Sequence, residues 1–119
     1  MADLTTFRLS RKANEVAELL VSTGWFDFAL TAAKFAMAYA LKNHFDEINP
    51  ATYVMPDNDG NTYNAGSLDS DGQISSMLRA IYPNCNTPYI YARNLMTFGL
   101  LKLGAKIESE GLQPISSYM

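Results

Sequence analysis

The chain contains few of the residues that most active sites are built from. Its 119 residues include one cysteine, Cys85, and one histidine, His44. A single cysteine cannot form an internal disulfide bond, and one residue of each type cannot supply the His and Cys ligands of a zinc site. A catalytic triad is equally short of partners, because its nucleophile needs an adjacent base. We therefore expect no metal, no cofactor and no enzymatic activity.

Long apolar runs and glycine-rich loops are also missing. No stretch approaches the ~20 apolar residues of a membrane span. Residues 1–12 lack the apolar centre of a signal peptide, which predicts a cytoplasmic protein without membrane association. Neither a phosphate-binding loop nor a Gly-x-Ser-x-Gly elbow is present. Hydrophobic residues make up 48% of the chain, which is enough for the core of a single domain over residues 1–119.

Acidic residues outnumber basic residues, but the excess of acidic residues is confined to one segment. The net charge is −3, and residues 44–72 hold six acidic side chains and no lysine or arginine. The segments on either side are mildly basic, so local fields matter more than the net charge. An EF-hand calcium loop needs an acidic ligand at position 1, glycine at position 6 and Glu at position 12. If either Gly60 or Gly72 is placed at position 6, the chain has no acidic residue at position 1 and no Glu at position 12. We interpret this segment as a solvated acidic connection.

The first residues predict a short strand. Over residues 4–9, Phe7 and Leu9 point to one face while Thr6 and Arg8 point to the other. A strand of this length cannot stand alone, so it needs a partner strand.

Two helices follow this strand. The strand and the two helices together form a strand–helix–helix unit over residues 1–43. Ser10 is a good N-cap for a helix that begins at Arg11, and Gly24 is a typical helix stop. Asp27 is the candidate cap of a second helix over residues 28–43. The apolar stripe of the first helix consists of Ala13, Val16, Ala17, Leu19 and Leu20.

The second helix is apolar almost all round. Only Thr31, Lys34 and Lys42 are polar within the stretch ALTAAKFAMAYALK. A helix of this kind must be covered on nearly every side. Either the C-terminal helices or a second copy of the chain can cover it, and we favour a homodimer.

The remaining chain predicts a connection and a second helical pair. Within the acidic connection, Asp59-Gly60 is a candidate turn for a small β-hairpin. The C-terminal pair over residues 73–110 consists of helices at 73–82 and 88–108, and we expect a loose tail over 111–119. The fold class is thus mainly α, with a short N-terminal strand followed by two helix–turn–helix units.

Details of the last helix indicate packing. Thr87-Pro88 is a strong helix start, and Gly99 and Gly104 inside the helix indicate close approach of another element. Tyr89, Tyr91 and Arg93 do not share one helix face, so we interpret them as core and rim packing and not as a surface on which bases stack.

The stretch TFRLSRKANEVAELLVSTGWFDFALTAAKFAMAYALKN resembles the ribbon–helix–helix DNA-binding family over residues 6–43. In that family a short strand pairs with its copy in a dimer and enters the major groove of DNA. The resemblance implies that Thr6, Arg8 and Ser10 face the bases, with Arg8 as a reader of guanine. Arg11 and Lys12 lie on the same contacting edge.

One segment departs from that family. Gly24 is followed by Trp25, Phe26 and Asp27, where the family usually has small polar residues that hold a DNA phosphate. Aromatic rings and a carboxylate would obstruct this contact. Trp25 and Phe26 are instead typical anchors of a protein–protein interface.

A second resemblance covers more of the chain. The segments GWFDFALTAAKFAMAYALKN and YIYARNLMTFGLLKLGAKIE are similar to small accessory proteins of bacterial DNA phosphorothioation (dnd-type) and phage-defence loci. This resemblance implies an accessory role near DNA without catalysis. Two hypotheses follow: a non-catalytic DNA-associated accessory or regulatory protein that binds double-stranded DNA, or a protein-interaction module that uses the acidic connection and Trp25/Phe26.

Overall fold

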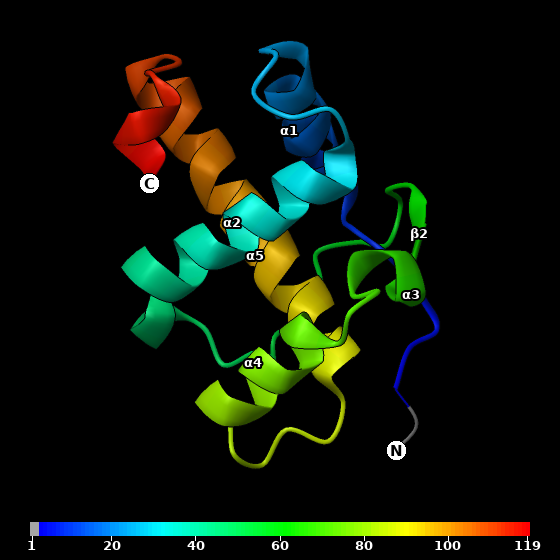
Figure 1. The fold of residues 1–119 in the computed structure, drawn as a ribbon. Helices are drawn as coiled ribbons and strands as arrows, with labels where there is room; N and C mark the ends of the chain where they lie inside the picture. The colour runs from blue at the N-terminus through cyan, green and yellow to red at the C-terminus, as the bar shows by residue number, and fades with distance from the viewer. Residues whose placement is uncertain (1–2) are drawn as a thin grey trace.

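The computed structural model describes residues 3–119 as a mainly helical domain with one pair of short strands (Figure 1). This architecture confirms the fold class predicted from the sequence. None of the helices in the described chain has the length and hydropathy needed to cross a membrane. In chain order, the elements are β1 (Thr6–Arg8), α1 (Arg11–Ser22), α2 (Ala29–Asn43), the 3-10 turn η1 (Phe45–Glu47), β2 (Thr62–Asn64), α3 (Ala65–Leu68), α4 (Gln73–Ile81), α5 (Pro88–Glu110) and η2 (Ile115–Tyr118).

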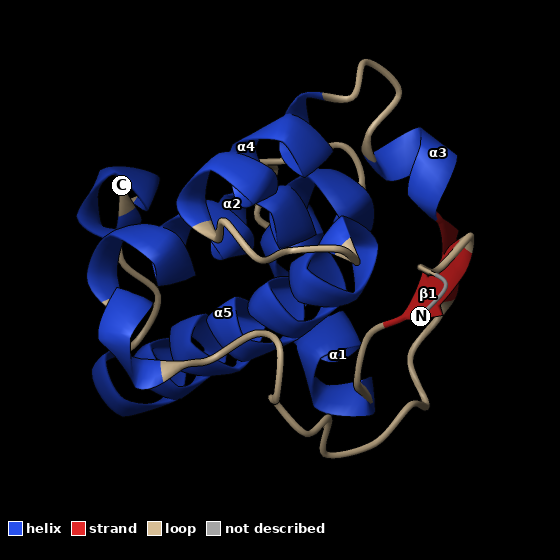
Figure 2. Cartoon of the chain, turned by 90° about the horizontal axis from the view of Figure 1, so that it is seen from below, coloured by secondary structure: helices blue, strands red, loops and turns tan. Residues whose placement is uncertain are grey.

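The strand β1 finds its partner within the same chain. It pairs antiparallel with β2, with Phe7 opposite Tyr63, and the two rings stack 5.7 Å apart on the inner face. Figure 2 shows this ribbon at one side of the helical body. The predicted hairpin around Asp59-Gly60 is wrong, because the Gly60 amide instead donates to the Leu9 carbonyl oxygen at 2.9 Å.

The helix α1 begins and ends where the sequence predicts. The Ser10 hydroxyl accepts a hydrogen bond from the Ala13 amide, and Gly24 follows the helix with φ +86°. The apolar stripe is buried except for Leu19, which is 42% exposed. Leu19 therefore lies beside the stripe and not in it.

The helix α2 is covered mainly by α1 and α5 of its own chain. Its alanines let α5 approach so closely that a Cβ added at Gly99 would lie 2.1 Å from the Ala36 carbonyl oxygen. Intrachain burial thus accounts for most of the apolar surface that suggested a homodimer. The predicted Asp27 cap is wrong: the helix starts after Phe28, and no side chain caps it.

Asp3, the first residue that the structure describes, contacts the start of α5. Thr87 occupies the N-cap position of α5 but its side chain makes no capping bond. The Asp3 carboxylate instead accepts hydrogen bonds from the amides of Tyr89 and Ile90 at 2.8 and 3.0 Å. A carboxylate is the favoured partner at this positive end of a helix.

The sequence predicts a loose C-terminal tail, but the structure shows a packed one. It folds back as η2, which buries Tyr118 to 2% exposure against Trp25. The Tyr118 hydroxyl also accepts a hydrogen bond from the Gln113 amide. Tyr118 therefore anchors the tail to the loop between α1 and α2.

The Gly99→Ala variant should lose more stability than Gly104→Ala. At Gly99 the new methyl group meets the α2 backbone, whereas at Gly104 it lies 2.6 Å from one methyl group of Val16, a side chain that can adjust. Overpacking costs about 1–3 kcal/mol, and we expect Gly99→Ala at or above the upper end. Urea unfolding of both variants measures the difference, and equal losses would contradict a backbone contact at Gly99.

Candidate functional site

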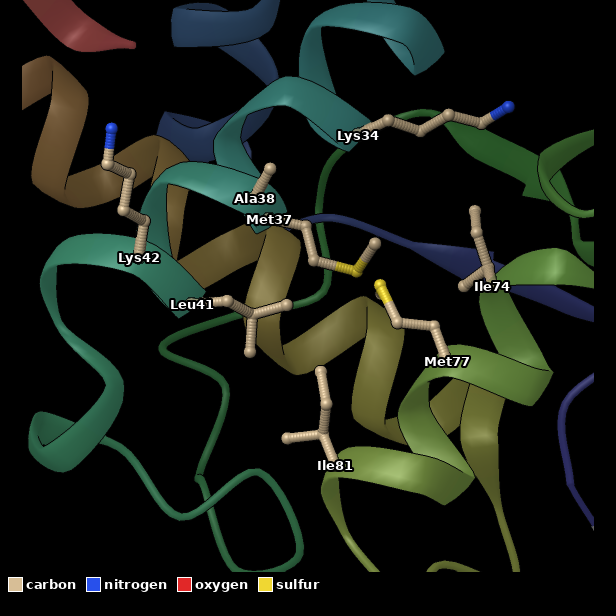
Figure 3. A pocket seen from close by; sticks show the side chains of 8 residues that line it. All are labelled: Lys34, Met37, Ala38, Leu41, Lys42, Ile74, Met77 and Ile81. Atoms are coloured by element: carbon tan, nitrogen blue, oxygen red, sulfur yellow. The ribbon is translucent and has the colours of Figure 1, made fainter.

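An apolar groove opens at the surface between α2 and α4. It encloses about 490 Å³. Figure 3 shows Met37 from α2 and Met77 from α4 pointing toward one another across it. The eight residues that line the groove are Lys34, Met37, Ala38, Leu41, Lys42, Ile74, Met77 and Ile81.

The groove exists because α4 packs on α5 and not closely on α2. Leu78 is the residue of α4 that is completely buried. Ile74, Met77 and Ile81 lie on the same face of α4 as Leu78, and Met77, at the edge of that face, is 37% exposed. One edge of this apolar face is therefore buried at Leu78, while the opposite edge, at Met77, is open to the groove.

The charges around the groove are all of one sign. Lys34 and Lys42 extend away from its centre in Figure 3. These two lysines are the only charged side chains in the lining of the groove, and neither α2 nor α4 contains an acidic residue. In a chain of net charge −3, the two walls of the groove thus form a locally positive surface.

The buried carboxylate of Asp69 positions α4. It accepts hydrogen bonds from the amides of Ile74 and Ser75 at 2.8 and 3.0 Å and from the Tyr89 hydroxyl of α5 at 2.9 Å. Burial alone would raise the pKa of Asp69, but these hydrogen bonds outweigh burial and hold the pKa below its ordinary value. An ionised Asp69 therefore ties the α4 wall of the groove to α5.

The residues expected to face DNA bases divide into an exposed and a buried set. Thr6 and Arg8 are exposed on the outer face of β1, opposite the exposed Asn64 and Thr62 of β2. The prediction that Ser10 faces the bases is wrong. Ser10 is fully buried, and its hydroxyl caps α1. One edge of β1 is occupied by β2 of the same chain, where the family resemblance implied a second copy.

The basic edge at the start of α1 lies beside acidic groups. Lys12 is exposed and forms an ion pair with Glu108 at 2.7 Å. Arg11 is exposed, and its amide donates to the Asp57 carboxylate at 2.7 Å. This backbone hydrogen bond, with a second from Asp59, lowers the pKa of Asp57. The acidic connection thus folds back onto the edge that was expected to contact DNA.

Trp25 and Phe26 are both half-buried against aromatic residues of their own chain. The Trp25 ring lies 6.1 Å from that of Tyr118, and the Phe26 ring lies 5.3 Å from that of Phe35. The exposed aromatic residue of this segment is Phe28, at 70%. The loop after α1 therefore uses its first two aromatic rings largely for packing.

The remaining chemically reactive groups are not gathered into one site. Cys85 is buried, and burial raises the pKa of its thiol. Within residues 3–119, no group of three or more His, Cys, Asp or Glu residues could hold a metal ion.

Sequence reasoning missed the groove, although a signal for it was present. Ile74, Met77 and Ile81 stand at positions i, i+3 and i+7, which is the spacing of one helix face. Periodicity shows that this face is apolar but not which part of it another element covers.

Comparison of the chain with protein-family models, with curated proteins and with solved structures gives no match.

The Asp69→Asn variant should destabilise the protein in a pH-dependent manner. A carboxyl whose pKa is lowered by folding contributes stability above its unfolded pKa of about 3.9, and this contribution is lost as the pH falls through the folded pKa. We expect a loss of about 1–3 kcal/mol at pH 7 that shrinks below pH ~4.

Urea unfolding over this pH range measures the effect. The matched control is Asp71→Asn, because Asp71 is exposed and an Asn side chain can keep its single bond from the Gln73 amide. A constant difference between Asp69→Asn and the unsubstituted protein at every pH would contradict the proposed role of the ionised carboxylate.

Proposed function

We propose that this protein is a protein-interaction module whose α2–α4 groove binds an acidic amphipathic helix of a partner. The observation that carries the proposal is an open groove of about 490 Å³ whose lining is apolar except for two lysines. Helices commonly lay an apolar stripe into such grooves through anchors at i, i+3 or i+4, and i+7.

The methionines suit this mode of binding. Met37 and Met77 face each other across the groove, and methionine side chains are flexible and polarisable. They can adapt to anchors of different shapes. The volume of about 490 Å³ fits a few large apolar side chains of a partner, while the rest of the partner helix remains at the surface.

Charge complementarity selects the acidic partner. Lys34 and Lys42 stand two helical turns apart along one wall, and neither α2 nor α4 contains an acidic residue. Acidic side chains beside the apolar stripe of a partner would meet these lysines, which favours correct orientation and faster association. A basic helix would be repelled.

A peptide selection tests this proposal. A displayed library of 16-residue helical peptides without charge bias is selected on the full chain, and the binders are sequenced. We expect enrichment of Asp and Glu beside an apolar stripe. Basic or charge-neutral binders, or no binders, would contradict the proposal.

The selected peptides then locate the binding site. Met77→Glu places a carboxylate in the groove at a partly exposed position, and Lys34→Glu/Lys42→Glu reverses the charge of its wall. Desolvating the new carboxylate costs several kcal/mol, so we expect Kd to rise at least tenfold. The matched control is Val54→Glu, at an 83% exposed site outside the groove.

Fluorescence anisotropy gives the Kd for each variant. Equal affinities in Met77→Glu and Val54→Glu would show that the peptides bind elsewhere. Sedimentation velocity adds a second check: a dimer that Met77→Glu dissociates would show that a second copy of the chain occupies the groove.

Association with double-stranded DNA is the second candidate function. It is favoured by the outer face of the β1–β2 ribbon, where the side chains of Thr6, Arg8, Thr62 and Asn64 are all polar and exposed. Arginine and small polar side chains on an antiparallel ribbon suit the major groove of DNA. The carboxylates of Asp57 and Glu108, which contact Arg11 and Lys12 at the start of α1, weaken the candidate because they repel phosphates from that basic edge.

Labelled duplex DNA titrated at low and moderate salt tests the second candidate. If the ribbon binds DNA, affinity should fall steeply with salt and should weaken in Arg8→Ala but not in Arg79→Ala, whose side chain lies on α4. Absence of binding at low salt, or equal losses in the two variants, would contradict a DNA contact at Arg8.

A further inference from the structure

A second cavity, separate from the groove, lies at the outer face of β1. It encloses about 290 Å³, and two arginines from distant parts of the chain line it: Arg8 of β1 and Arg93 of α5. The hydroxyl-bearing side chains of Thr6 and Thr62 and the amide side chain of Asn58 also line it. Every polar side chain in this lining can donate a hydrogen bond.

Arg93 is held in place by buried groups. Its Nε donates to the Asn94 Oδ1 at 3.1 Å, and Asn94 is only 1% exposed. The Asn94 Nδ2 in turn donates to the Pro50 carbonyl oxygen at 2.8 Å. The Arg93 guanidinium is thus fixed before any ligand arrives, and burial lowers its pKa. Such preorganisation reduces the entropy lost on binding.

The two guanidinium groups lack a counter-charge. Across residues 3–119, neither lies within 4.0 Å of a carboxylate, and the lining contains no acidic residue. Asp57 and Asp59 flank Asn58 in sequence, but the Asp57 carboxylate is engaged by the amides of Arg11 and Asp59 at the start of α1. Two like charges that line one cavity repel each other unless an anion lies between them.

We infer that this cavity binds a phosphate group between Arg8 and Arg93, with the threonine hydroxyls and Asn58 as further donors. The planar guanidinium group forms paired hydrogen bonds with phosphate oxygens. The phosphate can belong to the DNA backbone or to a small phosphorylated molecule. The inference shares Arg8 with the DNA candidate, but it rests on the cavity and does not depend on the α2–α4 groove.

Titration of the full chain with inorganic phosphate, at constant ionic strength, tests the inference. NMR signals of the arginine Nε–H groups report each side chain separately. We expect saturable shifts at Arg8 and Arg93 and none at Arg79, which is exposed on α4. Shifts that do not saturate, or that a chloride titration reproduces, would overturn the inference.

Three variants localise the site. Arg8→Gln and Arg93→Gln should each raise the phosphate Kd at least tenfold, because each removes charge-assisted hydrogen bonds. Arg79→Gln, the matched control, should leave it unchanged. Arg8 is exposed, so Arg8→Gln remains informative if Arg93→Gln disturbs folding. An unchanged Kd in Arg8→Gln would overturn the inference.

Labelled duplex DNA distinguishes the two sources of phosphate. If the backbone supplies it, inorganic phosphate should displace the duplex and Arg93→Gln should weaken duplex binding. If a small molecule supplies the phosphate, inorganic phosphate should bind, and this binding should weaken in Arg8→Gln and Arg93→Gln, while the duplex should not bind. Phosphate binding without duplex binding would reject the DNA candidate and support the phosphate site in the cavity. Failure of the DNA candidate can therefore be distinguished from failure of the phosphate site.

Discussion

The close contact between α2 and α5 is the constraint on which the other elements depend. Gly99 brings α5 against the backbone of α2 at Ala36, with no space for even one added carbon atom. Such an approach buries the alanine-rich face of α2 against α5 without a large side chain between the two helices at this point. The helix α1 then packs on both, and Gly104 admits Val16 at the contact between α1 and α5. The long α5 thereby becomes the support for α1, α2 and α4.

Two carboxylates fasten the remaining elements to this support. Asp3 receives the first amides of α5, which places the following strand β1 near the helix turn that carries Arg93. Asp69 receives two amides at the start of α4 together with the Tyr89 hydroxyl of α5. The outer cavity and the α4 wall of the groove are therefore both positioned by hydrogen bonds between charged side chains and helix starts.

The distribution of charge explains why the net charge says little about binding. Acidic residues of the connection serve internal contacts, as Asp57 does at α1 and Asp69 at α4. The walls of the groove keep only positive charges, and the outer cavity keeps two arginines without a carboxylate in its lining. A chain of net charge −3 thus presents two surfaces suited to negatively charged ligands.

The sequence by itself determined the features that depend on neighbours within a few residues. The alternation around Phe7, the Ser10 cap of α1 and the start of α5 at Pro88 follow from local hydrogen bonds and side-chain periodicity. Only the tertiary structure decided that β2 pairs with β1, that Asp3 caps α5 and that one edge of the apolar face of α4 stays open. Periodicity identifies an apolar face but not the element that covers it, because coverage depends on contacts between segments far apart in the chain.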